Sequence, residues 1–193
     1  MNKRAVVALL LLAPIPAFAA DPAAQLKAGG ILSASVPSGG AGVWPARAMA
    51  LVEASPEVVQ QVLANVADYK AFVPRFISSR QVKPGRFVVD LDLPWPVNRT
   101  WAYVQVAQSE RAGVRVLQWR MLNGTLKRYE GVAWIQPWGS KTLLTYQILA
   151  EPHTVAPASL INGGLRDAAT TVIEAVRKRT AKLAVRVASK TMY

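Results

Sequence analysis

The chain has 193 residues, of which 52% are hydrophobic, and its 23 lysines and arginines against 11 aspartates and glutamates give a formal net charge of +12. This length suits one domain of ordinary size, and the apolar content excludes a disordered chain. The sequence contains no cysteine, which excludes disulfides, thiolate metal sites and cysteine nucleophiles.

The first twenty residues have the pattern of a secretory signal peptide. A basic n-region at residues 3–4 precedes an apolar h-region at 5–13 and an A-x-A motif at 17–19. Nine apolar residues are too few to span about 30 Å of hydrocarbon, which argues against an uncleaved membrane anchor. We therefore expect cleavage after Ala19 or Ala20 and a periplasmic or secreted product.

The next segment leads into a single domain. Residues 21–30 are rich in alanine and glycine and are expected to form a flexible lead-in. Strands are predicted at residues 31–36 and 43–54. Ser55 is then a good N-cap for a helix whose first residue is proline, and a second short helix ends at Pro74. The expected division is a signal peptide, a lead-in and one domain, at residues 1–20, 21–30 and 31–189.

After the second helix the period of the apolar residues changes from 3.6 to about 2. This alternation predicts six strands with short connections, which is typical of an antiparallel meander. The strands are expected at residues 76–82, 86–93, 100–108, 114–122, 126–136 and 141–150. Between two of them, Asn123-Gly124 is a strong signal for a hairpin turn.

The last predicted element is a helix from Pro157 to about Ser189, because its apolar residues recur at steps of three and four. Such a helix is about 45 Å long and needs a broad apolar surface to lie on. We therefore predict an α+β fold in which a curved antiparallel sheet of seven to eight strands wraps around this helix. Two short helices follow the second strand.

The outer face of this last helix is strongly basic. One interpretation is that the face is solvated, and the other is that it contacts anionic lipid headgroups. The basic residues on it are Arg166, Arg177, Lys178, Arg179, Lys182, Arg186 and Lys190.

Three stretches carry a resemblance to a known family. They are VPSGG (36–40) with EASPEV (53–58), LPWPVNR (93–99) and YEGVAWIQP (129–137). The second is similar to the PWP…R turn, and the third to the G-x-W-x-x-x-P strand, of the START superfamily, whose relatives include polyketide cyclases and coenzyme Q-binding proteins. The likeness spans roughly residues 30–188 and implies a helix-grip fold. The chain departs from the family pattern at Asn98 and Thr100, where members commonly carry acidic residues beside the arginine.

The resemblance also implies a cavity between sheet and helix that holds one lipid-like molecule, such as a phospholipid, sterol, hopanoid or quinone. The candidate lining residues are Trp101, Tyr103, Leu117, Trp119, Met121, Trp134, Tyr146, Leu160, Ile161 and Leu165. The candidate headgroup contacts are Arg99, Arg120 and Glu130. The alternative interpretation is that these are ordinary core residues in a filled interior.

Two glycines, Gly163 and Gly164, fall near the start of the last helix. Each costs about 1 kcal/mol relative to alanine in a helix, which suggests a bend or a gate. A close-packing site or a loop before the true helix start are alternatives. In the gate hypothesis, residues 155–164 open against the turn at 94–99, which contains Trp95.

Few residues offer catalytic chemistry. His153 is the only histidine, and zinc needs three or four ligands, so we expect no metal, no cofactor and no catalytic residue. Asp90 and Asp92 share one face of a strand, which we interpret as the solvent-exposed face.

We expect a monomeric, non-enzymatic carrier of a hydrophobic molecule, with peripheral contact to anionic membranes and no nucleic-acid partner. The alternatives are a cyclase- or dehydratase-like enzyme using the same cavity, and an interaction module without a pocket.

Overall fold

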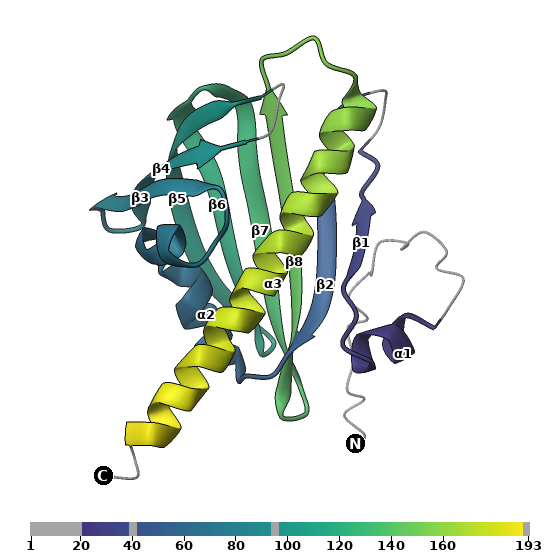
Figure 1. The fold of residues 1–193 in the computed structure, drawn as a ribbon, viewed down its shortest axis with the longest axis vertical. Coiled ribbons are helices and arrows are strands. Elements are labelled where there is room, and N and C mark those ends of the chain that lie inside the picture. Colours follow the sequence, from purple (N-terminus) through teal and green to yellow (C-terminus); the bar gives the residue numbers. More distant parts are fainter. Residues whose placement is uncertain (1–20, 39–41, 94–96, 191–193) are drawn as a thin grey trace, which may run out of the picture.

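The structure is a computed structural model that describes residues 21–38, 42–93 and 97–190. In this part of the chain an eight-stranded antiparallel sheet curves around one long helix (Figure 1). The helices are α1 (Pro22–Lys27), α2 (Pro56–Ala64), the 3-10 helix η1 (Val66–Ala71) and α3 (Ala158–Lys190). The strands are β1 (Leu32–Ser35), β2 (Ala46–Val52), β3 (Phe76–Lys83), β4 (Arg86–Asp92), β5 (Arg99–Arg111), β6 (Val114–Gly124), β7 (Leu126–Trp138) and β8 (Lys141–Pro152). The predicted signal peptide and Trp95 lie outside the described residues.

The strand order is β1-β2-β8-β7-β6-β5-β4-β3. The six strands from β3 to β8 form the predicted meander, and each pairs antiparallel with the next. β2 pairs with β8 at the other side of the sheet, so α2 and η1 carry the chain from one half of the sheet to the opposite edge. The predicted α+β helix-grip architecture is confirmed.

Small side chains on β2 let α3 approach the sheet closely. Ala46, Ala48 and Ala50 point inward and are 0% exposed, and the buried residues Ile173 and Val176 of α3 belong to the same core. Alanine is a weak strand former, but its short side chain suits a site that is covered by a helix. The helix therefore packs mainly over β2 and its neighbours β1 and β8.

The lead-in differs from the flexible segment that composition predicts. Residues 22–27 form α1, and the side chain of its N-cap, Asp21, accepts a hydrogen bond from the Ala23 amide at 2.9 Å. Leu26 is buried in a second small core with leucines of β1, β2 and β8. This burial orders the segment, because apolar area removed from water offsets the lost chain entropy.

The basic face of α3 is only partly solvated. Arg177 donates to the backbone carbonyls of Gly29 and Leu51 at 2.9 Å and of Gly30 at 3.3 Å. Arg179 forms an ion pair with a carboxylate of η1. These two arginines therefore attach neighbouring segments to the helix.

The predicted hairpin is present as β6 and β7, but Asn123-Gly124 does not form its turn. Both residues lie within β6 and pair with β5, and the chain turns one residue later. A Cβ added at Gly124 would lie 2.6 Å from the carbonyl oxygen of Trp101. Glycine is needed here because two backbones approach closely, and not because a tight turn requires it.

Candidate functional site

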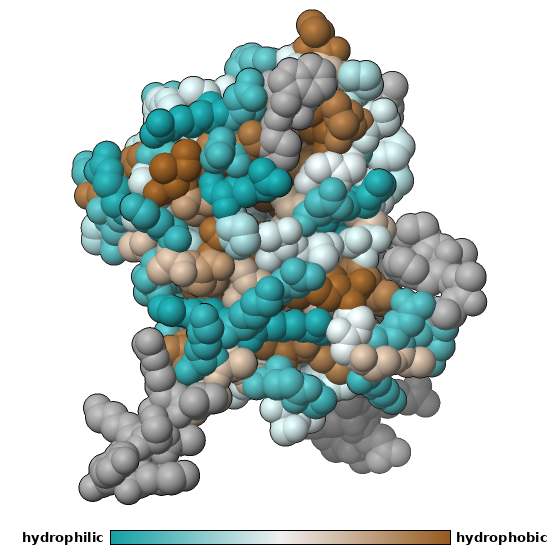
Figure 2. Space-filling view, in the orientation of Figure 1, coloured by the Kyte–Doolittle hydropathy of each residue, from teal (hydrophilic) through white to brown (hydrophobic). Residues whose placement is uncertain are grey.

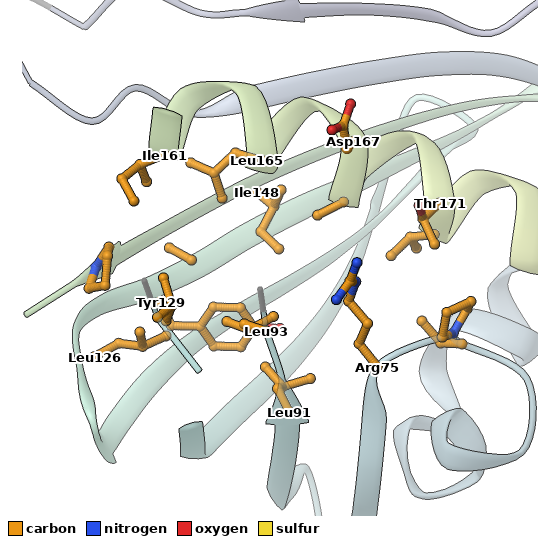
Figure 3. Close-up of a pocket in the computed structure, with 18 of the residues that line it drawn as sticks. Arg75, Leu91, Leu93, Leu126, Tyr129, Ile148, Ile161, Leu165, Asp167 and Thr171 are labelled. Atoms are coloured by element: carbon orange, nitrogen blue, oxygen red, sulfur yellow. The ribbon is translucent and has the colours of Figure 1, made fainter. Parts of the chain in front are cut away.

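A cavity of about 370 Å³ lies between the N-terminal half of α3 and one end of the sheet (Figure 3). At this end β3 and β7 begin and β4 and β8 finish, since neighbouring strands run antiparallel. Most of the wall is apolar, and its large aliphatic residues include Leu91, Leu93, Leu126, Ile148, Ile161 and Leu165. The volume is near the lower end of the range of about 300–1,000 Å³ that small-molecule sites span.

Strand and helix periodicity together build this wall. On β8, Tyr146, Ile148 and Ala150 alternate inward and line the cavity. On α3, Ile161 and Leu165 are one turn apart and both face the sheet. The cavity therefore forms where these two apolar surfaces face each other without meeting.

Four of the ten predicted lining residues lie on this cavity: Tyr146, Leu160, Ile161 and Leu165. Tyr146, Ile161 and Leu165 are buried, whereas Leu160 is half exposed, at the start of α3.

Two further predicted residues lie deeper in the core. Leu117 and Trp119 are buried beside a small internal void of about 30 Å³, which Tyr146 and Tyr129 also line. The rings of Trp119 and Tyr146 stack with centroids 5.1 Å apart. The indole N–H of Trp119 is buried and has no hydrogen-bond partner within the described residues. These residues shape the inner end of the site without lining the main cavity.

The remaining four predicted lining residues do not reach the cavity. Trp101 is 38% exposed, and Tyr103, on the same face of β5, is half-buried. Trp134 is also half-buried, and the guanidinium carbon of Arg47 lies 5.4 Å from the centroid of its ring. Met121 packs against the core without lining the cavity. The tryptophans and Tyr103 fall on the outer face of the sheet because inward residues alternate with outward ones, and the sequence did not determine which set was which.

The three predicted headgroup contacts lie away from the cavity. Arg99 is exposed, and Arg120 and Glu130 line a separate groove on the outer face of the sheet. Glu130 also forms an ion pair with Arg128. Their positions do not support a contact with a molecule inside the cavity.

The predicted break at Gly163 and Gly164 is absent. α3 continues through both glycines, and a Cβ added at either would have no heavy atom within 4 Å. Neither close packing nor a loop before the helix start therefore explains them, although Gly164 does line the cavity. The opening of residues 155–164 stays a hypothesis.

Two tyrosines provide neutral hydroxyl groups at the cavity. Burial raises the pKa of Tyr129 to about 12, although the neighbouring indole of Trp119 opposes the rise. Burial also raises the pKa of Tyr146 well above its ordinary value. Both phenols therefore stay protonated at physiological pH and offer neutral hydrogen-bond donors, not bases.

Sequence reasoning missed several lining residues. Ile148 and Ala150 lie two and four residues after Tyr146 on β8, and so on the same face of the strand. The prediction that Tyr146 faces the cavity could therefore have been extended to both. Arg75 and Leu126 carried no local signal, because they lie at element boundaries where periodicity gives no direction.

The residues considered for acid–base or metal chemistry do not converge. In the described ranges no group of three or more His, Cys, Asp or Glu side chains is placed to hold a metal ion. His153 is exposed, and Asp90 accepts a hydrogen bond from the Ser78 hydroxyl of the neighbouring strand. Over the same ranges, none of the helices has the length and apolar character needed to cross a membrane.

No family model matches the chain, and no curated protein matches it significantly. Solved structures do match its fold. A STAR-related lipid transfer protein from Xanthomonas axonopodis is 17% identical over 79% of this chain and 94% of its own, with a TM-score of 0.69. Human StAR-related lipid transfer protein 5 is 9% identical over 81% and 84%, with a TM-score of 0.66. An aromatase/cyclase from Streptomyces sp. R1128 is 15% identical over 72% and 93%, with a TM-score of 0.56. The chain therefore has the helix-grip fold of these proteins.

Proposed function

We propose that this protein binds one hydrophobic small molecule in the cavity beneath α3 and carries it through water. The observation that supports this proposal most directly is the apolar wall of the 370 Å³ cavity. The STAR-related lipid transfer proteins with the same fold support it as well.

The energetics make such a carrier useful. Exposing an alkyl chain to water costs about 0.8 kcal/mol per CH₂, so a twelve-carbon chain costs roughly 10 kcal/mol. A cavity that shields the chain removes most of this barrier to transfer. The volume suits a single chain or a compact ring system, and the ligand classes we propose are a lipid, a sterol or hopanoid, and a quinone.

Delivery to and from a membrane is part of the proposal. The β8–α3 connection places Val155 fully in solvent. Leu160, the third residue of α3, is half exposed and lines the cavity. Figure 2 shows apolar atoms at the top of the molecule, where this connection lies in Figure 1. We propose that this end touches the bilayer while basic residues elsewhere on the surface favour anionic headgroups.

Membrane contact is tested by vesicle sedimentation. Val155→Asp should reduce binding to vesicles that contain phosphatidylglycerol, because a charge in the apolar contact resists insertion. Val82→Asp, at an exposed position on β3, is the matched control. Equal vesicle binding by both variants and the wild type would show that the β8–α3 connection does not contact the membrane.

Export to the periplasm or beyond the cell is a further part of the proposal, and it is supported by the n-region, h-region and A-x-A motif of residues 1–20. N-terminal sequencing of the protein from its own host should find a mature chain that begins at Ala20 or Asp21. A chain that retains Met1 would contradict export by this route.

An enzymatic role in the same cavity is the alternative, since an aromatase/cyclase shares the fold. Catalysis of that kind needs a group that exchanges protons near neutral pH. The cavity tyrosines have raised pKa values, and Figure 3 shows the carboxylate of Asp167, the one acidic side chain among the described lining residues, directed away from the cavity. Both observations favour the binding role over this alternative.

The binding proposal is tested with N-phenyl-1-naphthylamine, a neutral probe that fluoresces in apolar sites. Ala168→Leu adds bulk to the α3 wall of the cavity and should weaken probe binding severalfold. Ala181→Leu makes the same change at an exposed site of α3 and should leave binding unchanged.

Native mass spectrometry of protein purified from its host complements this assay, and a co-purifying lipid, sterol or quinone is the expected result. Absence of any bound molecule, together with probe binding that Ala168→Leu does not affect, would contradict the carrier function.

A further inference from the structure

One positive charge faces the apolar cavity. Arg75 lies in the turn between η1 and β3, and it is the only basic residue among the described residues that line the cavity. Figure 3 shows its guanidinium directed toward α3, on the side of the cavity that carries Asp167 and Thr171. The side chain is exposed at the rim of the cavity, so a ligand headgroup that binds there exchanges water for a charge-assisted contact with the guanidinium.

The fold fixes the backbone that carries this side chain. Arg75 has a φ of 71°, in the left-handed region that residues other than glycine rarely adopt. Its carbonyl accepts a hydrogen bond from the amide of Asp92 at 2.8 Å. Val73 before it is buried, and the ring of Phe76 after it packs edge-on against Tyr69 at 5.3 Å. Anchors on both sides therefore hold the turn in this conformation.

The guanidinium has hydrogen-bonding capacity to spare. Within the described residues it makes neither a hydrogen bond nor an ion pair. Arg80, Arg86 and Arg99 also make no such contact within the described residues, so Arg75 is distinguished by its place on the cavity wall. The five N–H donors of Arg75 form a planar fork that matches a carboxylate or a phosphate.

The neighbouring polar groups are compatible with an anionic partner. The carboxylate of Asp167 lines the same corner, but Figure 3 shows it directed away from the cavity. Thr171, one turn further along α3, adds a neutral hydroxyl. The opposite end of the cavity is aliphatic, with Leu126 and Ile161. The cavity thus has one charged corner and one apolar end.

We propose that Arg75 binds the anionic headgroup of a single-chain amphiphile whose alkyl chain lies along α3 toward Leu126 and Ile161. The headgroup is a carboxylate or a phosphate monoester, because both present two oxygens to the guanidinium fork. This inference rests on the proposed function and specifies the chemical class of its ligand.

The experiment measures displacement of N-phenyl-1-naphthylamine by three ligands that share a twelve-carbon chain. Laurate and dodecyl phosphate are anionic at pH 7.5, whereas dodecan-1-ol is neutral. The wild type should bind the better of the two anions about tenfold more tightly than the alcohol, the effect of one charge-assisted contact. The order of laurate and dodecyl phosphate distinguishes a fatty acid from a phosphate-bearing ligand.

Four variants test the assignment to Arg75. Arg75→Gln should reduce the preference for anions to less than about twofold, and Arg75→Lys should retain part of it. Asp167→Asn should preserve or increase the preference, because it removes a negative charge from the same corner. Arg80→Gln, at an exposed position of β3 outside the cavity, should leave the preference unchanged. Cooperative thermal unfolding of each variant confirms that it is folded.

The outcomes separate this inference from the proposed function. If the anions and the alcohol bind equally well to the wild type, or if Arg75→Gln keeps the preference, the role of Arg75 is overturned while hydrophobic binding stands. If the wild type binds neither the probe nor any twelve-carbon ligand, both proposals are overturned.

Discussion

The indole ring of Trp119 lies directly over Gly131 of the neighbouring strand. A Cβ added at Gly131 would come within 2.1 Å of the ring. The two residues pair across β6 and β7, and the same indole stacks on Tyr146 of β8. Glycine at this position therefore lets the ring lie against the sheet, between the small internal void and the groove on the outer face.

Substitution of this glycine should be costly. Gly131→Ala forces the indole out of its stack with Tyr146, and overpacking of this kind destabilises a folded protein by about 1–3 kcal/mol. Urea unfolding measures the loss, and near-ultraviolet circular dichroism should report a weaker signal from the displaced ring. Unchanged stability and an unchanged spectrum would show that the contact is easily relieved.

The glycine at position 163 should behave in the opposite way. It is in a helix, and an added Cβ meets nothing within 4 Å. Gly163→Ala should therefore stabilise the protein by about 1 kcal/mol, the usual gain in helix propensity. Thermal unfolding measures this gain.

The same variant tests the gate hypothesis. Stopped-flow uptake of N-phenyl-1-naphthylamine by Gly163→Ala should match the wild type if α3 stays rigid. Slower uptake would indicate that α3 bends at Gly163 when ligand enters.

Arg177 should stabilise the N-terminal segment that contains α1 and β1. Its guanidinium donates to the carbonyls of Gly29, Gly30 and Leu51. Arg177→Ala leaves these carbonyls without their charged donor, and we expect a loss of about 1–3 kcal/mol in the free energy of unfolding. Faster amide exchange and proteolysis should be confined to α1 and β1. Lys178→Ala, at the exposed neighbouring position, should have little effect.

Stability should fall in acid partly because of Glu57. Backbone and Ser55 hydrogen bonds and the neighbouring Arg115 lower the pKa of Glu57 to about 2, below its ordinary value of 4.5. The folded state holds this carboxylate at the lower pKa. Its contribution to the free energy of unfolding is therefore complete above about pH 4.5 and is lost as the pH falls toward 2. The unfolding free energy of Glu57→Gln should depend less steeply on pH across this interval. The carboxylate is exposed, so salt should weaken the effect. An identical slope in the variant and the wild type would contradict the assignment.

The sequence alone determined the strands, the helices after β2 and the long helix α3, together with their order, but not α1. Alternation along residues 76–150 predicted the meander, and three- and four-residue steps predicted α3 to within one residue of its start. These patterns are local, because a strand or helix with one buried face repeats its own period. The resemblance to START domains then indicated how the sheet and helix combine.

The tertiary structure decided which side chains face the cavity. One register step reverses the direction of every side chain on a strand, so Trp101 and Trp134 fall outside while Tyr129 falls inside. It also decided that α3 packs on the alanines of β2 and leaves space elsewhere. Arg75 comes to face a helix about ninety residues further along the chain, and no local pattern encodes a contact at that separation, because chain closure over such a distance depends on how the whole sheet curves.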